Sequence, residues 1–252
     1  MVRSIQVFRY EDASSEEDIF RILSKEKIVK YTTENKNNKS KKIEIQCNIS
    51  EVKQGDYGVS GHFFYRYQEK INRYTDDEKY AIWAEHYDFL ISPKAGIIII
   101  HGSIKFRRHV RNLISQLIHQ GLGFFKEIII QKEGMMDLIT EIRKDKKENN
   151  VSNPNFDFLE KKYNDWTELD FATGEILCVT NHRDFQKYYN ATTLWSPKMR
   201  IKQCTGIVET PHDDRASLMM KYDASFTLSQ HASPNQWNKF VFEKCKKSLG
   251  LR

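Results

Sequence analysis

The sequence lacks the short motifs that mark the commonest enzyme classes. Its 252 residues contain no Walker loop, no G-x-G-x-x-G and no G-x-S-x-G. These are the signatures of phosphate-loop nucleotidases, dinucleotide-binding enzymes and serine hydrolases. Their absence argues against those classes, and the sequence predicts no cofactor.

Metal-binding and disulfide patterns are also missing. The eight histidines show neither H-x-H nor H-x-x-x-H spacing, so the sequence predicts no metal site. No C-x-x-C pair occurs among the cysteines, which argues against a zinc knuckle and a disulfide framework. The four cysteines are Cys47, Cys178, Cys204 and Cys245.

Long apolar runs are absent as well. The first ten residues, MVRSIQVFRY, lack the apolar core of a signal peptide. No run approaches the roughly 20 apolar residues of a membrane helix. Together with the dispersed thiols, these features predict a soluble intracellular protein, cytoplasmic or in the nucleoid or nucleus, without a membrane partner.

The composition that is present is that of a globular chain with a mild basic bias. Hydrophobic residues make up 39% and aromatic residues 12%, which excludes a disordered tail. Forty lysines and arginines against 34 acids give a formal charge of +6. This bias favours nucleic acid or another anionic surface as the partner, without deciding between them.

The best-specified stretch runs from Ser92 to Gly121. A turn at SPKAG precedes four β-branched residues, Ile97–Ile100, which predict a buried strand. Ser103 is a suitable N-cap for the helix that follows, and Gly121 is suited to end it. The predicted apolar stripe of this helix is Phe106, Val110, Leu113, Ile114, Leu117 and Ile118.

The charges of this helix are unusual. Four basic residues crowd its first half, and no acid lies between Ile104 and Gln120. Cations are unfavourable at the positive end of the helix dipole, whereas a helix N-terminus with arginines suits a phosphate or carboxylate. The alternative is a solvated basic face that pairs with acids elsewhere, such as the run 76–78. The four residues are Lys105, Arg107, Arg108 and Arg111.

A hairpin is predicted at 43–52 and 59–67, and its second arm is aromatic. In that arm Phe63, Tyr65 and Tyr67 alternate with His62, Phe64 and Arg66. Aromatic and basic residues alternating in this way are typical of a sheet surface on which unpaired bases stack. The alternative is ordinary packing of aromatic residues in a sheet core.

The neighbouring segments predict further elements. A helix capped by Ser15 would bury Ile19, Phe20, Ile22, Leu23 and Ile28, and a polar loop would follow at 33–42. A strand at 81–91 would pair with Ile97–Ile100 across the SPKAG turn. A last helix, 235–249, would begin after Ser233-Pro234.

The sequence predicts an α+β fold, a largely antiparallel sheet with helices packed on one face. The polar segment 149–155 is the predicted linker between an N-terminal half, 1–148, and a C-terminal half, 156–252. In both halves, several predicted strands are followed by a predicted helix that begins at a serine. Gln46-Cys47 in the first half matches Gln203-Cys204 in the second. The halves are therefore a candidate internal repeat.

Catalytic groups are sparse. The triplets Glu51-Val52-Lys53 and Glu160-Lys161-Lys162 fit a metal-dependent nuclease, but such triplets arise by chance in a chain rich in glutamate and lysine. Glu85 and His86 fall on opposite faces of their predicted strand. No catalytic residue is assigned.

The leading hypothesis is a non-catalytic nucleic-acid-binding protein, with DNA or RNA as the partner. Phosphates would be contacted at the basic helix start, since such contacts supply affinity and salt dependence. The competing hypothesis is a protein-interaction subunit whose aromatic residues form the anchor, and a metal-dependent nuclease is the third. The predicted contact residues are Lys105, Arg107, Arg108 and Arg111, helped by Arg66, Arg73 and Tyr65.

Overall fold

The structure, a computed structural model, forms two compact units, Arg9–Lys126 and Met1–Phe8 with Glu127–Arg252. Its strands pair almost throughout in antiparallel fashion and its helices are few, so the predicted α+β class is confirmed. The predicted linker lies outside the described residues, and the division there and the internal repeat stay predictions. The described residues are 2–11, 14–71, 79–119, 125–131, 133–135, 137–138, 168–170, 175–177, 200–201, 203–209 and 215–251.

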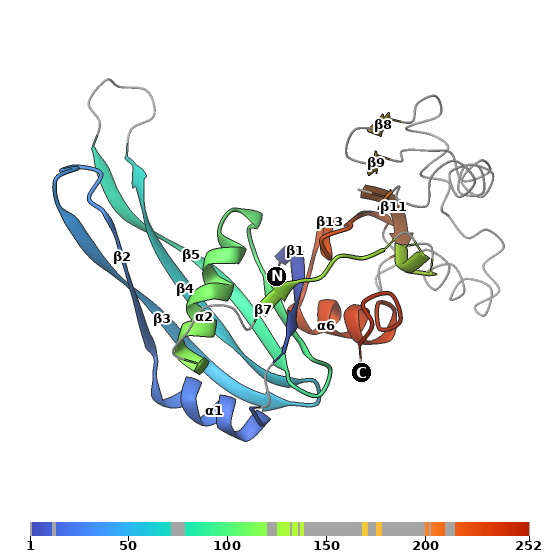
Figure 1. Cartoon of the computed structure of the whole chain (residues 1–252), viewed down its shortest axis with the longest axis horizontal. Coiled ribbons are helices and arrows are strands. Elements are labelled where there is room, and N and C mark those ends of the chain that lie inside the picture. The colour runs from blue at the N-terminus through green and yellow to red at the C-terminus, as the bar shows by residue number, and fades with distance from the viewer. Residues whose placement is uncertain are drawn as a thin grey trace. The chain divides into compact units, whose positions relative to one another are not determined.

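The unit Arg9–Lys126 is built on five strands that pair in the order in which they occur along the chain (Figure 1). The predicted hairpin is confirmed, and so is the pairing of the 81–91 strand with Ile97–Ile100. The strands are β2 (Ile28–Glu34), β3 (Lys42–Gly55), β4 (Gly58–Lys70), β5 (Tyr80–Ser92) and β6 (Ile97–His101).

The helix predicted at Ser15 is α1 (Glu16–Lys25), and it is shorter than expected. The Ser15 hydroxyl accepts a hydrogen bond from the Asp18 N–H at 3.1 Å, as an N-cap does. The prediction that Ile28 belongs to its buried side is wrong, because Ile28 begins β2 and is 51% exposed. The segment Ile28–Glu34 contains Val, Tyr and two Thr, which favour a strand, and these outweigh the helical spacing of Ile28.

The basic helix is α2 (Arg107–His119), preceded by the short 3-10 turn η1 (Ile104–Phe106). Ser103 caps this turn by accepting a hydrogen bond from the Lys105 N–H. The predicted apolar stripe from Val110 to Ile118 is buried. In Figure 1, α1 and α2 lie on the same face of β2–β5.

The hairpin between β3 and β4 contains two backbone features that its length alone does not reveal. Gly58 has φ +133°, and a Cβ there would lie 2.2 Å from the Ile91 carbonyl oxygen, so only glycine fits. Between Ser50 and Lys53 the register of β3 shifts in a β-bulge, and Glu51 within it has φ 49°. A non-glycine residue in this region is uncommon and often marks a functional position.

The other unit contains an antiparallel sheet in which β1 pairs with β13, β13 with β12 and β12 with β11. Its last helix is confirmed with a full capping box between Ser233 and Gln236, although it ends at Glu243 and not at Leu249. The sequence also predicts helices at 156–163 and 184–189, and both segments lie outside the described residues. Its elements are β8 (Glu168–Asp170), β9 (Glu175–Leu177), β10 (Arg200–Ile201), β11 (Gln203–Glu209), β12 (Arg215–Lys221), β13 (Ser225–Ala232) and α6 (Pro234–Glu243). Two further strands, β1 (Val2–Tyr10) and β7 (Phe125–Glu127), contain residues of both units.

Candidate functional site

Alternation along β4 separates its side chains onto two faces of the sheet. Phe63, Tyr65 and Tyr67 are buried, and the Tyr65 ring contacts Phe106 of η1 and His109 of α2. We call this the helix face. His62, Phe64 and Arg66 point the opposite way, onto what we call the outer face, since successive residues of a strand alternate.

The helix face uses Tyr65 as a core residue. Its ring is 2% exposed, stacks against Tyr31 and Tyr67, and its hydroxyl lies 3.3 Å from His109 Nδ1. Burial raises the pKa of the Tyr65 phenol. Of the two hypotheses for the aromatic strand, core packing therefore describes the residues of this face, and Tyr65 presents no ring to solvent.

The start of the basic helix is also largely engaged within the fold. Arg107 is fully buried, and its Nε and Nη2 donate hydrogen bonds to the Gly102 carbonyl at 3.1 and 2.6 Å. Arg107 is thus not placed on the surface, where the predicted phosphate contact would require it. A surface position was predicted for this arginine because nothing in the sequence around it indicates that its guanidinium binds a backbone carbonyl.

The remaining predicted contact residues lie on both faces. Lys105 Nζ is 3.0 Å from Glu69 Oε1 and 4.8 Å from the centre of the Tyr67 ring. Arg111 donates to Asn112 Oδ1, whereas Arg108 is exposed. Arg66 is exposed on the outer face, where it donates to the Gln46 carbonyl. Arg73, like the acidic run 76–78, lies outside the described residues.

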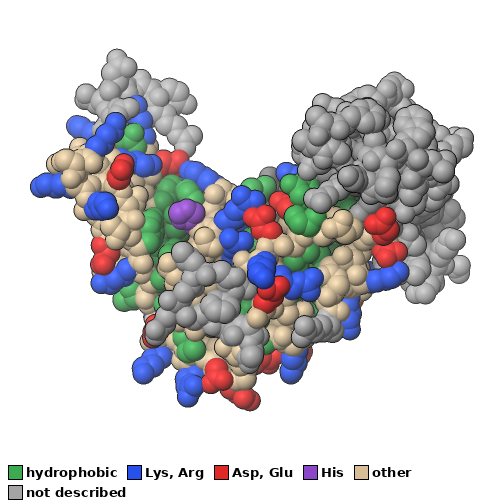
Figure 2. All heavy atoms as spheres, in the orientation of Figure 1, with side chains coloured by type: hydrophobic (Ala, Val, Ile, Leu, Met, Phe, Trp, Pro, Cys, Tyr) green, Lys and Arg blue, Asp and Glu red, His purple; other side chains and the backbone are tan. Residues whose placement is uncertain are grey.

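The charged side chains do not gather in one basic field on the side of the molecule that Figure 2 shows. Lysine and arginine side chains are scattered there, with acidic side chains among them. The predicted contact residues therefore do not converge, because η1 and α2 place Lys105, Arg108 and Arg111 on the helix side and β4 places Arg66 on the other. A single ligand surface has to use one side or the other.

The outer face presents an exposed aromatic row. Phe64 is 39% exposed and stacks on His86 of β5, with 5.0 Å between ring centres and 18° between planes. Phe64 pairs in register with Asn48 of β3, and Asn48 pairs with Ile28 of β2. The side chain of Ile28 is half exposed. Large apolar side chains on the solvent side of a sheet are candidates for ligand contact.

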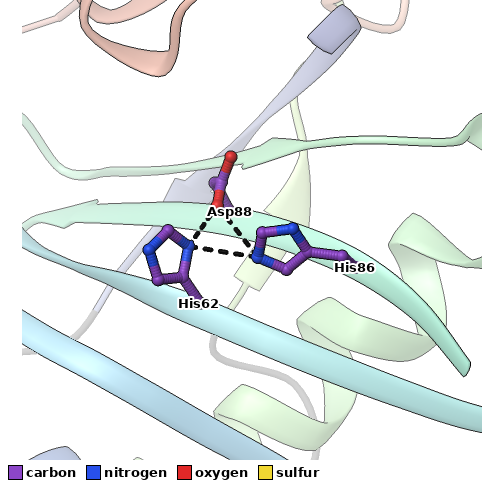
Figure 3. Close-up of side chains that lie close together, drawn as sticks. All are labelled: His62, His86 and Asp88. Atoms are coloured by element: carbon purple, nitrogen blue, oxygen red, sulfur yellow. Dashed lines mark hydrogen bonds and ion pairs between the residues drawn. The ribbon is translucent and has the colours of Figure 1, made fainter. Parts of the chain in front are cut away.

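In the next row of the outer face, His62 and Asp88 lie beside His86 of the first row, so that two histidines and a carboxylate come together (Figure 3). His62 of β4 pairs in register with Asp88 of β5, and its Nδ1 is hydrogen-bonded to Asp88 Oδ1. His86 Nε2 lies 3.3 Å from the same carboxylate oxygen and 3.1 Å from His62 Nδ1. All three donor atoms lie within 4.8 Å of one another, an arrangement that can hold a metal ion.

Glu51 extends this cluster from the β-bulge of β3. Its Oε2 lies 3.4 Å from Nε2 of His62, which is the ring nitrogen facing away from Asp88. Lys53 pairs with the same carboxylate at 3.3 Å. The hydrogen bond and the ion pair with Lys53 lower the pKa of Glu51.

Sequence reasoning did not find this cluster. Spacings along one segment cannot reveal it, because His62 reaches His86 and Asp88 only through the register between β4 and β5. The one signal in the sequence is His86-x-Asp88, two residues on the same face of a predicted strand. The bulge that places Glu51 beside His62 leaves no recognisable mark in the sequence.

Comparison with known sequences does not identify the site. The sequence matches no protein-family model and no curated protein. Among the described residues, no helix is long and apolar enough to cross a membrane.

Proposed function

We propose that the chain binds single-stranded nucleic acid on the outer face of β2–β5. The exposed ring of Phe64, stacked on His86 and followed on the same strand by Arg66, carries this proposal. Bases that are not paired stack on exposed aromatic residues of a sheet, and arginines beside them contact phosphates. The formal charge of +6 favours an anionic partner.

The outer face supports this function better than the start of α2 does. Its aromatic ring and its arginine are both exposed, whereas Arg107 is buried and Lys105 is paired with Glu69. A duplex offers its bases only at groove edges, but a single strand can place a base flat against the Phe64 ring. We therefore expect single strands to bind more tightly than duplexes.

A protein partner is the second candidate, favoured by the exposed side chains of Ile28 and Ile82. Both are about half exposed and lie on the outer face with Phe64. Large apolar side chains are common anchors of protein interfaces. The third hypothesis, a metal-dependent nuclease, remains a prediction, and it requires a bound metal ion for catalysis.

Fluorescence anisotropy with labelled single-stranded and duplex DNA and RNA tests the proposal. We expect Phe64→Ala to weaken single-strand binding about tenfold, since stacking contributes about 1–3 kcal/mol per base. Arg66→Ala should reduce the slope of log binding constant against log salt concentration by about one, the contribution of one phosphate contact.

Arg108→Ala is the matched control, because it removes an exposed arginine from the helix side. It should leave binding within about twofold of wild type, on the scale of a side chain outside the interface. Loss of binding in Arg108→Ala with retention in Phe64→Ala would overturn the outer face and return the site to the start of α2. Absence of binding to every nucleic acid would favour the protein partner.

A further inference from the structure

We propose that His62, His86 and Asp88 form a binding site for a divalent transition-metal ion of the zinc class. The ligand atoms would be His62 Nδ1, His86 Nε2 and Asp88 Oδ1. Two imidazole nitrogens and one carboxylate oxygen are a donor set that zinc and its neighbours accept. This inference does not rest on nucleic-acid binding.

The spacing of the donor atoms matches a coordination sphere. Ligands at about 2.0–2.1 Å from a tetrahedral ion stand about 3.3 Å from one another. His86 Nε2 lies 3.1 Å from His62 Nδ1 and 3.3 Å from Asp88 Oδ1. The third pair, His62 Nδ1 and Asp88 Oδ1, is a direct hydrogen bond, whose proton an ion would replace.

The neighbouring groups hold these ligands as the surroundings of a metal site do. A histidine that binds a metal through one ring nitrogen almost always donates its other N–H to a carboxylate, carbonyl or water. Glu51 Oε2 lies 3.4 Å from His62 Nε2 and fills this role. The Phe64 ring stacks on His86 and fixes the plane of that imidazole.

The position of Glu51 has a backbone cause that points to the same site. Glu51 adopts φ 49° at a bulge where the register of β3 against β4 shifts. Bulges re-aim side chains next to functional sites, and a left-handed glutamate is a strained conformation. In the proposed site, this strained conformation places the Glu51 carboxylate beside His62, where it orients the imidazole ring.

Three protein ligands leave further coordination positions of the ion open. The side chains of His62 and His86 are 32% and 50% exposed, so the site is accessible from solvent, whereas that of Asp88 is 11% exposed. Sites with three protein ligands and an open position bind water or substrate there. The arrangement thus differs from a closed structural zinc site with four protein ligands.

Isothermal titration calorimetry of the full chain with Zn²⁺, after EDTA treatment and dialysis, tests the site. We expect one ion per chain, and we expect His62→Ala and His86→Ala each to weaken binding by 30-fold or more. Glu51→Gln should weaken it about tenfold, the size of effect seen when a partner of a metal-binding histidine is changed. Replacement by Co²⁺ should give the d–d absorption of a four-coordinate ion with nitrogen and oxygen ligands.

His231→Ala is the matched control, since His231 is an exposed histidine of β13 in the other unit. It should bind Zn²⁺ within twofold of wild type. Circular dichroism is the check that each variant is folded. His86→Ala, at a half-exposed position, is the variant least dependent on packing. Zn²⁺ binding that is absent in wild type, or unchanged in both His62→Ala and His86→Ala, would overturn the site.

Discussion

The two faces of β4 carry similar side chains and use them in opposite ways. Phe63 and Phe64 are neighbours in sequence, yet Phe63 is fully buried under the helices and Phe64 is 39% exposed. The aromatic content of a strand therefore does not separate a core from a binding surface. What separates them is the alternation of the strand and the side on which the helices pack.

The polar groups of the two faces differ in the same way. On the helix face the Tyr67 and Tyr87 hydroxyls both donate to Glu85, at 3.0 and 2.7 Å, and burial raises the pKa of both phenols. On the outer face His62, His86 and Asp88 turn toward one another beside solvent. The first arrangement satisfies a core, whereas the second offers donor atoms to a ligand.

The largest expected difference between the faces is in the free energy of unfolding of two adjacent variants. Phe63→Ala should lose about 4 kcal/mol, because it leaves a cavity in a packed core. Phe64→Ala should lose less than about 1 kcal/mol, because its ring is partly in water. Urea-induced unfolding followed by circular dichroism measures both, and equal losses would show that the outer face is covered.

A second adjacent pair makes the same comparison for charge. Arg107→Met should lose about 2–3 kcal/mol, because the Gly102 carbonyl loses two charge-assisted hydrogen bonds. Arg108→Met, one residue along and exposed, should change stability by no more than about 0.5 kcal/mol. The same urea experiment reads both. An Arg107→Met variant as stable as wild type would contradict the stabilising role of Arg107 inside the fold.

Much of the fold could be predicted from local patterns. The β-branched run Ile97–Ile100, the serine caps of α1 and α6, and the hairpin around Gly58 each depend on residues close in sequence, and each is confirmed. Such signals act within one turn or one strand. The strand β2 was missed because its start, Ile28, also fits the spacing of the preceding helix.

The candidate site could not be predicted in the same way. The period of two correctly puts His86 and Asp88 on one face, but the partner strand and its register decide that His62 joins them. Register depends on bulges and turns, and a single residue of slip would move His62 to the opposite face. For the basic helix, charge alone could not show that Arg107 turns inward to a backbone carbonyl.

The last comparison, with the smallest expected difference in stability, concerns the contact between the helix face and α2. The Tyr65 hydroxyl lies 3.3 Å from His109 Nδ1, a long hydrogen bond, so Tyr65→Phe should lose only about 1 kcal/mol of unfolding free energy. A double-mutant cycle with His109→Ala isolates the pair, and we expect a coupling energy of about 0.5–1 kcal/mol. Single-stranded nucleic-acid binding and Zn²⁺ binding should both be unchanged in Tyr65→Phe, because its ring faces the helices. A loss of either in this variant would mean that the two faces are coupled, and the division between core and binding surface would no longer hold.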